Sequence, residues 1–168
     1  LNLDEGSPFR GRIRTTTSRH LDSANIKDLS ILKMLENSLR DGVLYRYRNA
    51  PAKAIRLLRN YWLAVGSRYS EAWELPPKKS RLTHGVGIIS MGYVMDLVSF
   101  RLAGEDREIP RTEHFAEELN RLGDGIPWTD GVWEFSRDMR MPWNTLQNTN
   151  AHIDLLTNHL IRKFRGTE

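Results

Sequence analysis

The chain has 168 residues, of which 39% are hydrophobic and 27% are charged, and this balance is typical of one globular domain rather than of a disordered chain. It contains no cysteine, which excludes disulfide bridges and thiolate metal sites and fits a reducing, cytoplasmic compartment. Its longest uncharged apolar stretch, residues 85–95, is far shorter than the roughly 20 residues that span a bilayer, so we expect no membrane segment. The chain has neither an initiating Met nor a signal-peptide pattern, and we expect it to be the C-terminal fragment of a longer protein.

The formal net charge of +4 is unevenly distributed along the chain. Residues 40–81 contain ten Lys or Arg and three Asp or Glu, a net charge of +7, whereas residues 103–138 contain four and ten, a net charge of −6. The basic segment could form a face for an acidic partner, or the two segments could pack side by side and neutralise one another. Both interpretations stay open at this point.

The first predicted element is a short strand. Residues 8–17 alternate apolar or small side chains with arginines, a pattern typical of a half-exposed edge strand. A helix is then predicted from a cap at Asn25 to about Arg40, where Gly42 ends it. The apolar positions of this helix are Ile26, Leu29, Met34 and Leu35.

A second helix is predicted to begin at Pro51, because proline is tolerated in a first helical turn. Apolar residues recur there at a spacing of three or four, namely at Ile55, Leu58, Trp62, Val65 and Tyr69. The other face carries Lys53, Arg56 and Arg59, so one side of the helix should enter the core while the other is cationic. Residues 70–80, with two consecutive prolines, are predicted to be a connecting loop.

Two more helices are predicted in the middle of the chain. Thr83 can cap one that runs to about Leu102, and a shorter acidic helix follows Thr112 and ends at Gly123. The inward residues of the acidic helix are Phe115, Leu119 and Leu122.

The last helix opens at Asn150, and its apolar stripe consists of Ile153, Leu156, Leu160 and Phe164. Residues 126–145 before it are predicted to be irregular and anchored by Trp128, Trp133 and Trp143. The sequence therefore predicts a mainly α fold: a single domain over residues 1–168, with about five helices and a short β element near the N-terminus.

The turn before the third helix could bind an anion. Backbone N–H groups at Gly85 and Gly87, with cations beside them, could hold a phosphate. Glycine at these positions equally allows close packing between helices, and we prefer this packing interpretation. The run from Gly85 to Ser90 departs from the dinucleotide fingerprint, because serine replaces the third glycine and the preceding segment is too charged for a buried strand.

A second candidate region is Tyr45-Arg46-Tyr47-Arg48, which alternates rings and guanidinium groups as single-strand binders do. An edge strand with its tyrosines inward explains the same alternation, and we prefer it. Candidate nucleic-acid or phosphate-binding residues are Arg46, Arg48, Lys53, Arg56, Arg59, Lys78, Lys79, Arg81, His84, Gly85 and Gly87. We expect the cations among them to share one surface.

We predict no catalytic residue, metal site or cofactor. His152 and His159 share a helical face but lie about 10 Å apart, too far to bind one zinc ion. Ser90 has one residue too many around it for a hydrolase elbow. The carboxylates at Glu105, Asp106, Glu108, Glu117 and Glu118 are interpreted as solvated surface groups.

Several motifs recur in one order along the chain: Ser7-Pro8-Phe9 to Ile13, Leu58-x-x-Tyr61-Trp62 with Ala72-Trp73, Ser80-Arg81-Leu82-Thr83-His84-Gly85-Val86-Gly87, and Pro127-Trp128 with Gly131. In this order the chain resembles the C-terminal part of the DGQHR-domain proteins, bacterial and archaeal proteins related to the regulator of DNA phosphorothioate modification. The DGQHR peptide itself is absent and would lie upstream. The resemblance implies a helical portion of a protein tied to DNA modification, defence or mobile elements, and it carries over no catalytic residue.

We therefore expect a non-enzymatic nucleic-acid-binding or regulatory module, with DNA or RNA and other proteins as partners and no membrane. Two alternatives stay open. The chain could be a fragment of a hydrolase or nucleotide-using enzyme whose catalytic residues lie upstream, or it could be a scaffold that docks partner proteins.

Overall fold

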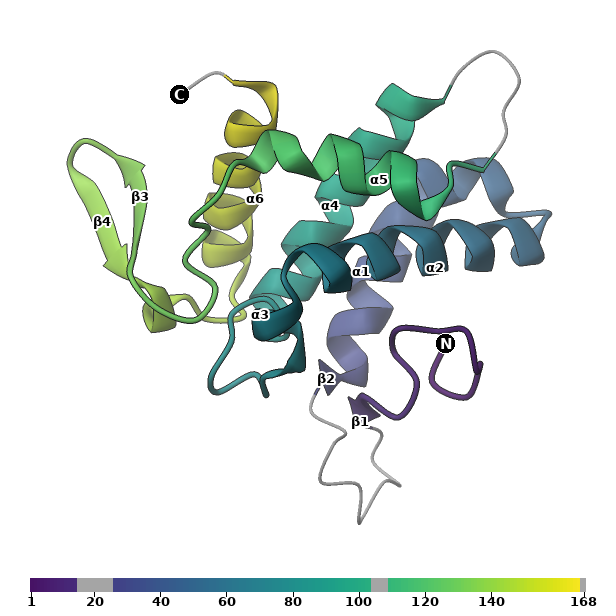
Figure 1. Cartoon of the computed structure of the whole chain (residues 1–168), viewed down its shortest axis with the longest axis horizontal. Coiled ribbons are helices and arrows are strands. Elements are labelled where there is room, and N and C mark those ends of the chain that lie inside the picture. The colour runs from purple at the N-terminus through teal and green to yellow at the C-terminus, as the bar shows by residue number, and fades with distance from the viewer. Residues whose placement is uncertain (15–25, 104–108, 167–168) are drawn as a thin grey trace.

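The computed structural model describes residues 1–14, 26–103 and 109–166 (Figure 1). The described residues are mainly helical, with one short pair of strands near the N-terminus, which confirms the predicted fold class. The α-helices are α1 (Asp28–Asp41), α2 (Pro51–Arg68), α3 (Ser70–Glu74), α4 (Gly85–Leu102), α5 (Thr112–Leu119) and α6 (Asn150–Arg165). Helix α4 packs between α1 and α6, and α2 packs along α5 (Figure 1).

Helix α4 is the centre of the core. It is apolar on all sides, and such a helix is stable in water only when neighbours cover it. By length and composition α4 could cross a membrane, but 67% of it is buried inside the fold, as expected for the central helix of a soluble protein. Its small residues allow close contact with α1, because a Cβ on Gly92 would overlap the side chain of Met34.

Helix α2 begins at Pro51, as predicted, and buries an aromatic cluster. Tyr61 and Trp62 are fully buried, and the Tyr61 hydroxyl donates a hydrogen bond to the Met91 carbonyl oxygen at 2.8 Å. Phe9 packs edge-on against Trp62, with ring centroids 5.1 Å apart. The predicted stripe is wrong at Ile55, which is exposed in the second turn of the helix.

The N-terminal β element is shorter than predicted. Of residues 8–17, strand β1 (Ile13–Arg14) takes two, and it pairs in parallel with β2 (Ile26–Lys27). Residues 15–17 and the predicted cap Asn25 lie outside the described residues. Helix α1 ends at Asp41, immediately before Gly42, as predicted. Its predicted start is wrong, because the helix begins at Asp28 and Ile26 lies in β2. Leu29 is exposed, while Ser30 and Ile31 face the core.

Two stretches that were predicted to be loops contain regular structure. The loop predicted after α2 begins with α3, in which Trp73 is buried. The region predicted to be irregular contains a β-hairpin of β3 (Val132–Ser136) and β4 (Met139–Pro142). Trp133 and Phe135 alternate with exposed residues in β3, which is the period of a half-buried strand, so the signal was present in the sequence.

The predictions for the last two helices are confirmed. Helix α5 continues into the 3₁₀ turn η2 (Asn120–Leu122), and Gly123 ends it with a φ of 71°. In α6 all four stripe residues are buried, and the Thr149 hydroxyl accepts a capping hydrogen bond from the His152 N–H.

Candidate nucleic-acid interface

The start of α4 is capped by a histidine. His84 Nδ1 accepts a hydrogen bond from the Val86 N–H at 3.4 Å. Burial lowers the pKa of His84 to about 4, with the positive charges of Arg81 and Lys27 adding to the effect. The predicted cap at Thr83 is wrong, because its hydroxyl donates instead to the Leu75 carbonyl oxygen at 2.8 Å.

The two glycines of the predicted phosphate turn are packed by the protein itself. Gly87 is buried, and a Cβ there would overlap the Arg81 carbonyl oxygen. A Cβ on Gly85 would lie 2.6 Å from Ser30 Oγ and 2.7 Å from the Asn148 side chain. These glycines therefore serve close packing, and the phosphate interpretation of Gly87 is corrected because a buried backbone cannot reach a ligand.

Arg81 is also occupied within the fold. It is only 7% exposed, and its guanidinium donates to the carbonyl oxygens of Pro77 at 3.0 Å and Asn144 at 2.8 Å. The guanidinium also lies over the Trp143 ring, 5.5 Å from its centroid. Burial lowers the pKa of Arg81 from its ordinary value. Its expected place on a basic surface is therefore corrected: Arg81 fastens the loop before α4 to the 3₁₀ turn η3 (Trp143–Thr145).

The other seven candidate cations form two groups. Arg46 and Arg48 lie on the 3₁₀ helix η1 (Val43–Tyr47) or at its end, and Lys53, Arg56 and Arg59 lie on α2. Lys78 and Lys79 lie in the loop after α3, beyond the other end of α2. Since α2 has 18 residues and is about 27 Å long, the groups are well separated (Figure 1). None of these cations forms an ion pair with an acidic residue of the described ranges.

The first group lies beside exposed aromatic rings. The Arg48 guanidinium lies over the Tyr45 ring at 4.3 Å, and that of Arg46 lies over Phe100 of α4 at 4.6 Å. Tyr45 is 49% exposed and Phe100 is 41% exposed. The preferred edge-strand interpretation of residues 45–48 is therefore wrong, since they form or follow a 3₁₀ helix and Tyr45 faces solvent. Phe100 was not among the predicted residues, although its position beside Arg101 at the end of the apolar helix was visible in the sequence.

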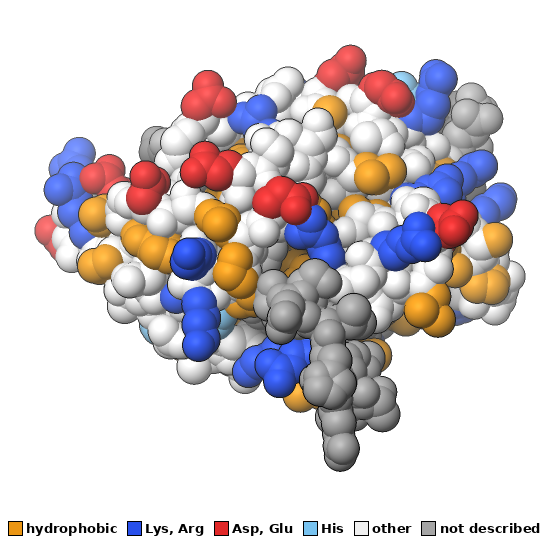
Figure 2. Space-filling view, turned by 60° about the horizontal axis from the view of Figure 1, so that its bottom comes forward, with side chains coloured by type: hydrophobic (Ala, Val, Ile, Leu, Met, Phe, Trp, Pro, Cys, Tyr) orange, Lys and Arg blue, Asp and Glu red, His pale blue; other side chains and the backbone are white. Residues whose placement is uncertain are grey.

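We name this surface the η1–α2 face, and it consists of Tyr45, Arg46, Arg48, Lys53, Arg56, Arg59 and Phe100. Figure 2 shows Lys and Arg side chains gathered with hydrophobic ones at the right-hand end of the molecule, where α2 begins in Figure 1. Most of its cations are exposed, while Arg59 is partly buried beside Gly6. The face combines positive charge with accessible ring surface.

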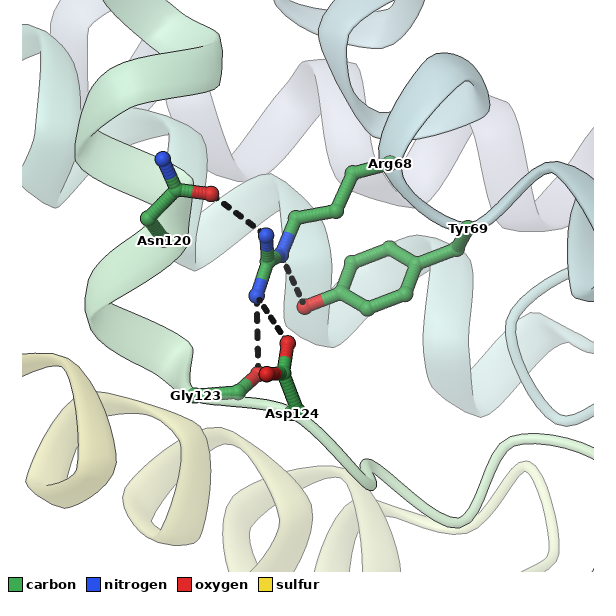
Figure 3. Close-up of polar contacts among 5 residues, drawn as sticks. All are labelled: Arg68, Tyr69, Asn120, Gly123 and Asp124. Atoms are coloured by element: carbon green, nitrogen blue, oxygen red, sulfur yellow. Dashed lines mark hydrogen bonds and ion pairs between the residues drawn. The ribbon is translucent and has the colours of Figure 1, made fainter.

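The acidic segment, residues 103–138, pairs with Arg68 rather than with a cation of the η1–α2 face. Arg68 at the end of α2 donates to Asn120 Oδ1 at 2.5 Å, to the Gly123 carbonyl oxygen at 2.9 Å and to Asp124 at 3.3 Å (Figure 3). Glu118 binds Arg101 at 2.9 Å and Arg121 at 3.0 Å, both of which lie outside the basic segment. Among the described residues of the two segments, the ion pair that joins them is therefore that of Arg68 with Asp124.

The other chemical candidates are structural in the described residues. Ser90 is buried, and its hydroxyl donates to the Ile153 carbonyl oxygen at 3.3 Å. His152 Nδ1 accepts from the Gln147 N–H at 2.9 Å, while His159 packs against the Phe135 ring at 5.3 Å. Within residues 1–14, 26–103 and 109–166, no group of three His, Asp or Glu side chains could hold a metal ion. Glu105, Asp106 and Glu108 lie outside these ranges.

Comparison of the chain with protein-family models, curated proteins and solved structures finds no match. The resemblance to DGQHR-domain proteins stays a prediction.

Proposed function

We propose that this chain is a non-enzymatic nucleic-acid-binding module of a cytoplasmic protein concerned with DNA modification or defence. The observation that carries the proposal is the η1–α2 face, where exposed cations without acidic partners in the described residues adjoin two exposed rings. Its association with DNA modification or defence rests on the resemblance to DGQHR-domain proteins.

The chemistry of this face suits a single strand. Lys and Arg side chains neutralise phosphates and release the counterions condensed around them, which makes such binding strongly dependent on salt. An arginine that stacks on one side of a ring leaves the other side to a nucleobase, and stacking of this kind tolerates any base sequence. We therefore propose binding with little sequence preference, and tighter binding to single strands than to duplexes.

The test is fluorescence anisotropy with labelled oligonucleotides, in single-stranded and duplex form, over a series of salt concentrations. Replacing Arg46, Lys53 and Arg56 together by alanine removes three exposed cations and should flatten the plot of log affinity against log salt by about two units for a single strand. The control is Lys78→Ala with Lys79→Ala, which removes two cations beyond the other end of α2 and should leave the slope nearly unchanged, whereas two phosphate contacts would flatten it by about 1.4 units. An unchanged slope in the triple variant would contradict the proposal.

A docking scaffold is the second candidate function, and α1 favours it. Leu29, Leu32 and Leu39 are all exposed on this helix at spacings of three and seven residues, which place them along one side of it, and apolar side chains grouped in this way can mark a protein-contact site. If the oligonucleotides do not bind, light scattering of the parent and of a Leu32→Glu, Leu39→Glu variant tests this candidate by asking whether α1 drives self-association.

A further inference from the structure

A hollow lies where the last turns of α4 and α6 meet the 3₁₀ turn η2. Its volume is about 460 Å³, which is within the range of about 300 to 1,000 Å³ typical of small-ligand pockets. Both helices end toward the upper edge of the molecule in Figure 1. The side chains that line the hollow are Leu97, Phe100, Arg101, Arg121, Phe164 and Arg165. The hollow therefore combines apolar and aromatic side chains with arginines.

The hollow adjoins the η1–α2 face through Phe100. This residue is 41% exposed and lines the hollow, and the Arg46 guanidinium of the η1–α2 face lies over its ring at 4.6 Å. A strand bound at Arg46 can therefore continue into the hollow across Phe100. The ring of Phe164 is less accessible, because Phe164 is 4% exposed and the Arg121 guanidinium lies over it, 5.9 Å from its centroid. Phe100 is thus the ring of the hollow on which a ligand can stack.

The arginines of the hollow are only partly neutralised. Arg101 and Arg121 share one carboxylate, because the Nε atoms of both lie within 3.0 Å of Glu118 Oε2. One carboxylate balances one of these two positive charges. Arg165, in the last turn of α6, is exposed and forms no ion pair within the part of the chain that the structure describes. Arg165 is therefore the arginine of the hollow that can turn its guanidinium toward a ligand without breaking an ion pair.

The side chains around the hollow offer hydrogen-bond donors and no acceptor. Guanidinium groups only donate, while the leucine and phenylalanine side chains do neither. A flat ring whose edge presents acceptors matches this lining. Guanine presents O6 and N7, to which arginine donates as a pair, whereas adenine has a donating amino group in place of O6.

We propose that the hollow binds one base of the strand held by the η1–α2 face, and that it selects a purine with a carbonyl oxygen at C6 over adenine. The base stacks on Phe100 and accepts hydrogen bonds from Arg165 at O6 and N7. This inference rests on the proposed function. It adds a preference at one position to a strand that is otherwise bound with little regard to sequence.

The experiment compares two labelled strands of about twelve deoxynucleotides by fluorescence anisotropy with the whole chain. One is all deoxyadenosine, and the other has a single deoxyinosine, whose base keeps N7 and has a C6 carbonyl in place of the amino group. The inosine strand should bind at least about fivefold more tightly at the same salt concentration. Equal affinities would overturn this inference and leave the proposed function intact, whereas no binding of either strand would overturn both.

Three variants locate the recognition. Arg165→Met removes the donors and one charge, and the matched control Lys79→Met removes one exposed charge in the loop after α3. The ratio of the two affinities should fall to about one in Arg165→Met and stay unchanged in Lys79→Met, because loss of charge alone weakens both strands equally. Leu97→Trp fills the hollow and should also abolish the preference, and urea unfolding shows whether it folds. A preference that survives in Arg165→Met would overturn the proposal, whether or not Leu97→Trp folds.

A competing ligand tests a different occupant of the hollow. Decanoate is an anion with an alkyl chain, which cannot accept hydrogen bonds along its length or stack as a flat ring does. It should not displace the inosine strand at equal concentration. Displacement that lowers the affinity of the inosine strand to that of the adenine strand would assign the hollow to apolar anions and overturn the proposal.

Discussion

The cap of α4 makes stability depend on pH in a specific way. His84 accepts the Val86 N–H only through a neutral Nδ1, and a protonated ring would place a positive charge at a helix N-terminus beside Arg81. The pKa of His84 is about 4 in the folded protein and about 6.5 when the chain is unfolded. The pKa of His84 is lower in the folded protein than in the unfolded chain. The stability that depends on a neutral His84 is therefore fully present above pH 6.5 and is lost as the pH falls toward 4.

The size of the effect follows from these two values. Between pH 7 and pH 5 the unfolded chain takes up a proton at His84 while the folded protein does not, which corresponds to about 2 kcal/mol for a fully buried ring. The side chain is only half-buried, so solvent screening reduces the expected loss to about 1 kcal/mol.

Urea unfolding of the parent and of His84→Asn at pH 7 and pH 5 measures this contribution. Asparagine is a good N-cap that does not titrate, so the variant should be within about 1 kcal/mol of the parent at pH 7. On lowering the pH, the parent should lose about 1 kcal/mol more than the variant does, and groups common to both proteins cancel in this difference. If both proteins respond identically to pH, the histidine cap does not control stability and the reasoning is refuted.

Three other substitutions test the packing around α4. Gly87→Ala should lower stability by about 1 to 3 kcal/mol, seen as a lower melting temperature, because its methyl group would overlap the Arg81 carbonyl oxygen; an unchanged melt would contradict this. Arg81→Met should cost about 1 to 3 kcal/mol in urea unfolding, since the carbonyl oxygens of Pro77 and Asn144 lose their donors; full stability would show that water replaces them. Burial raises the pKa of Asp96 in the folded protein. Its contribution to the free energy of unfolding is therefore present below about pH 4, the ordinary pKa of aspartate, and is lost as the pH rises through the raised pKa. Asp96→Asn, whose amide oxygen can still accept from Ser38 and the Val43 N–H, should therefore be at least as stable as the parent at pH 7 and lose that advantage near pH 4; the opposite trend in urea unfolding would contradict this.

The helices were predictable where local pattern and burial agree. In α6 the stripe from Ile153 to Phe164 faces the core because one helix face packs against one neighbouring surface. In α1 the same reasoning selected Leu29, yet the core takes Ser30 and Ile31, since α1 packs against a helix whose glycine allows close approach. Periodicity shows that a face exists, but it does not show which neighbour the face will meet.

The candidate surface was predictable only in part. The sequence by itself determined the composition of the basic segment and the cationic side of α2, because residues three or four apart share a helix face. Tertiary structure decided which cations are exposed to a ligand. Arg81 is not, because it contacts Pro77, Asn144 and Trp143, and the last two lie more than 60 residues away in sequence. Tertiary structure also brought Phe100 beside Arg46, a contact between separate elements that no local pattern specifies. The physical reason is that helix formation depends on neighbours along the chain, whereas the burial of a charge or the exposure of a ring depends on which distant segments pack against it.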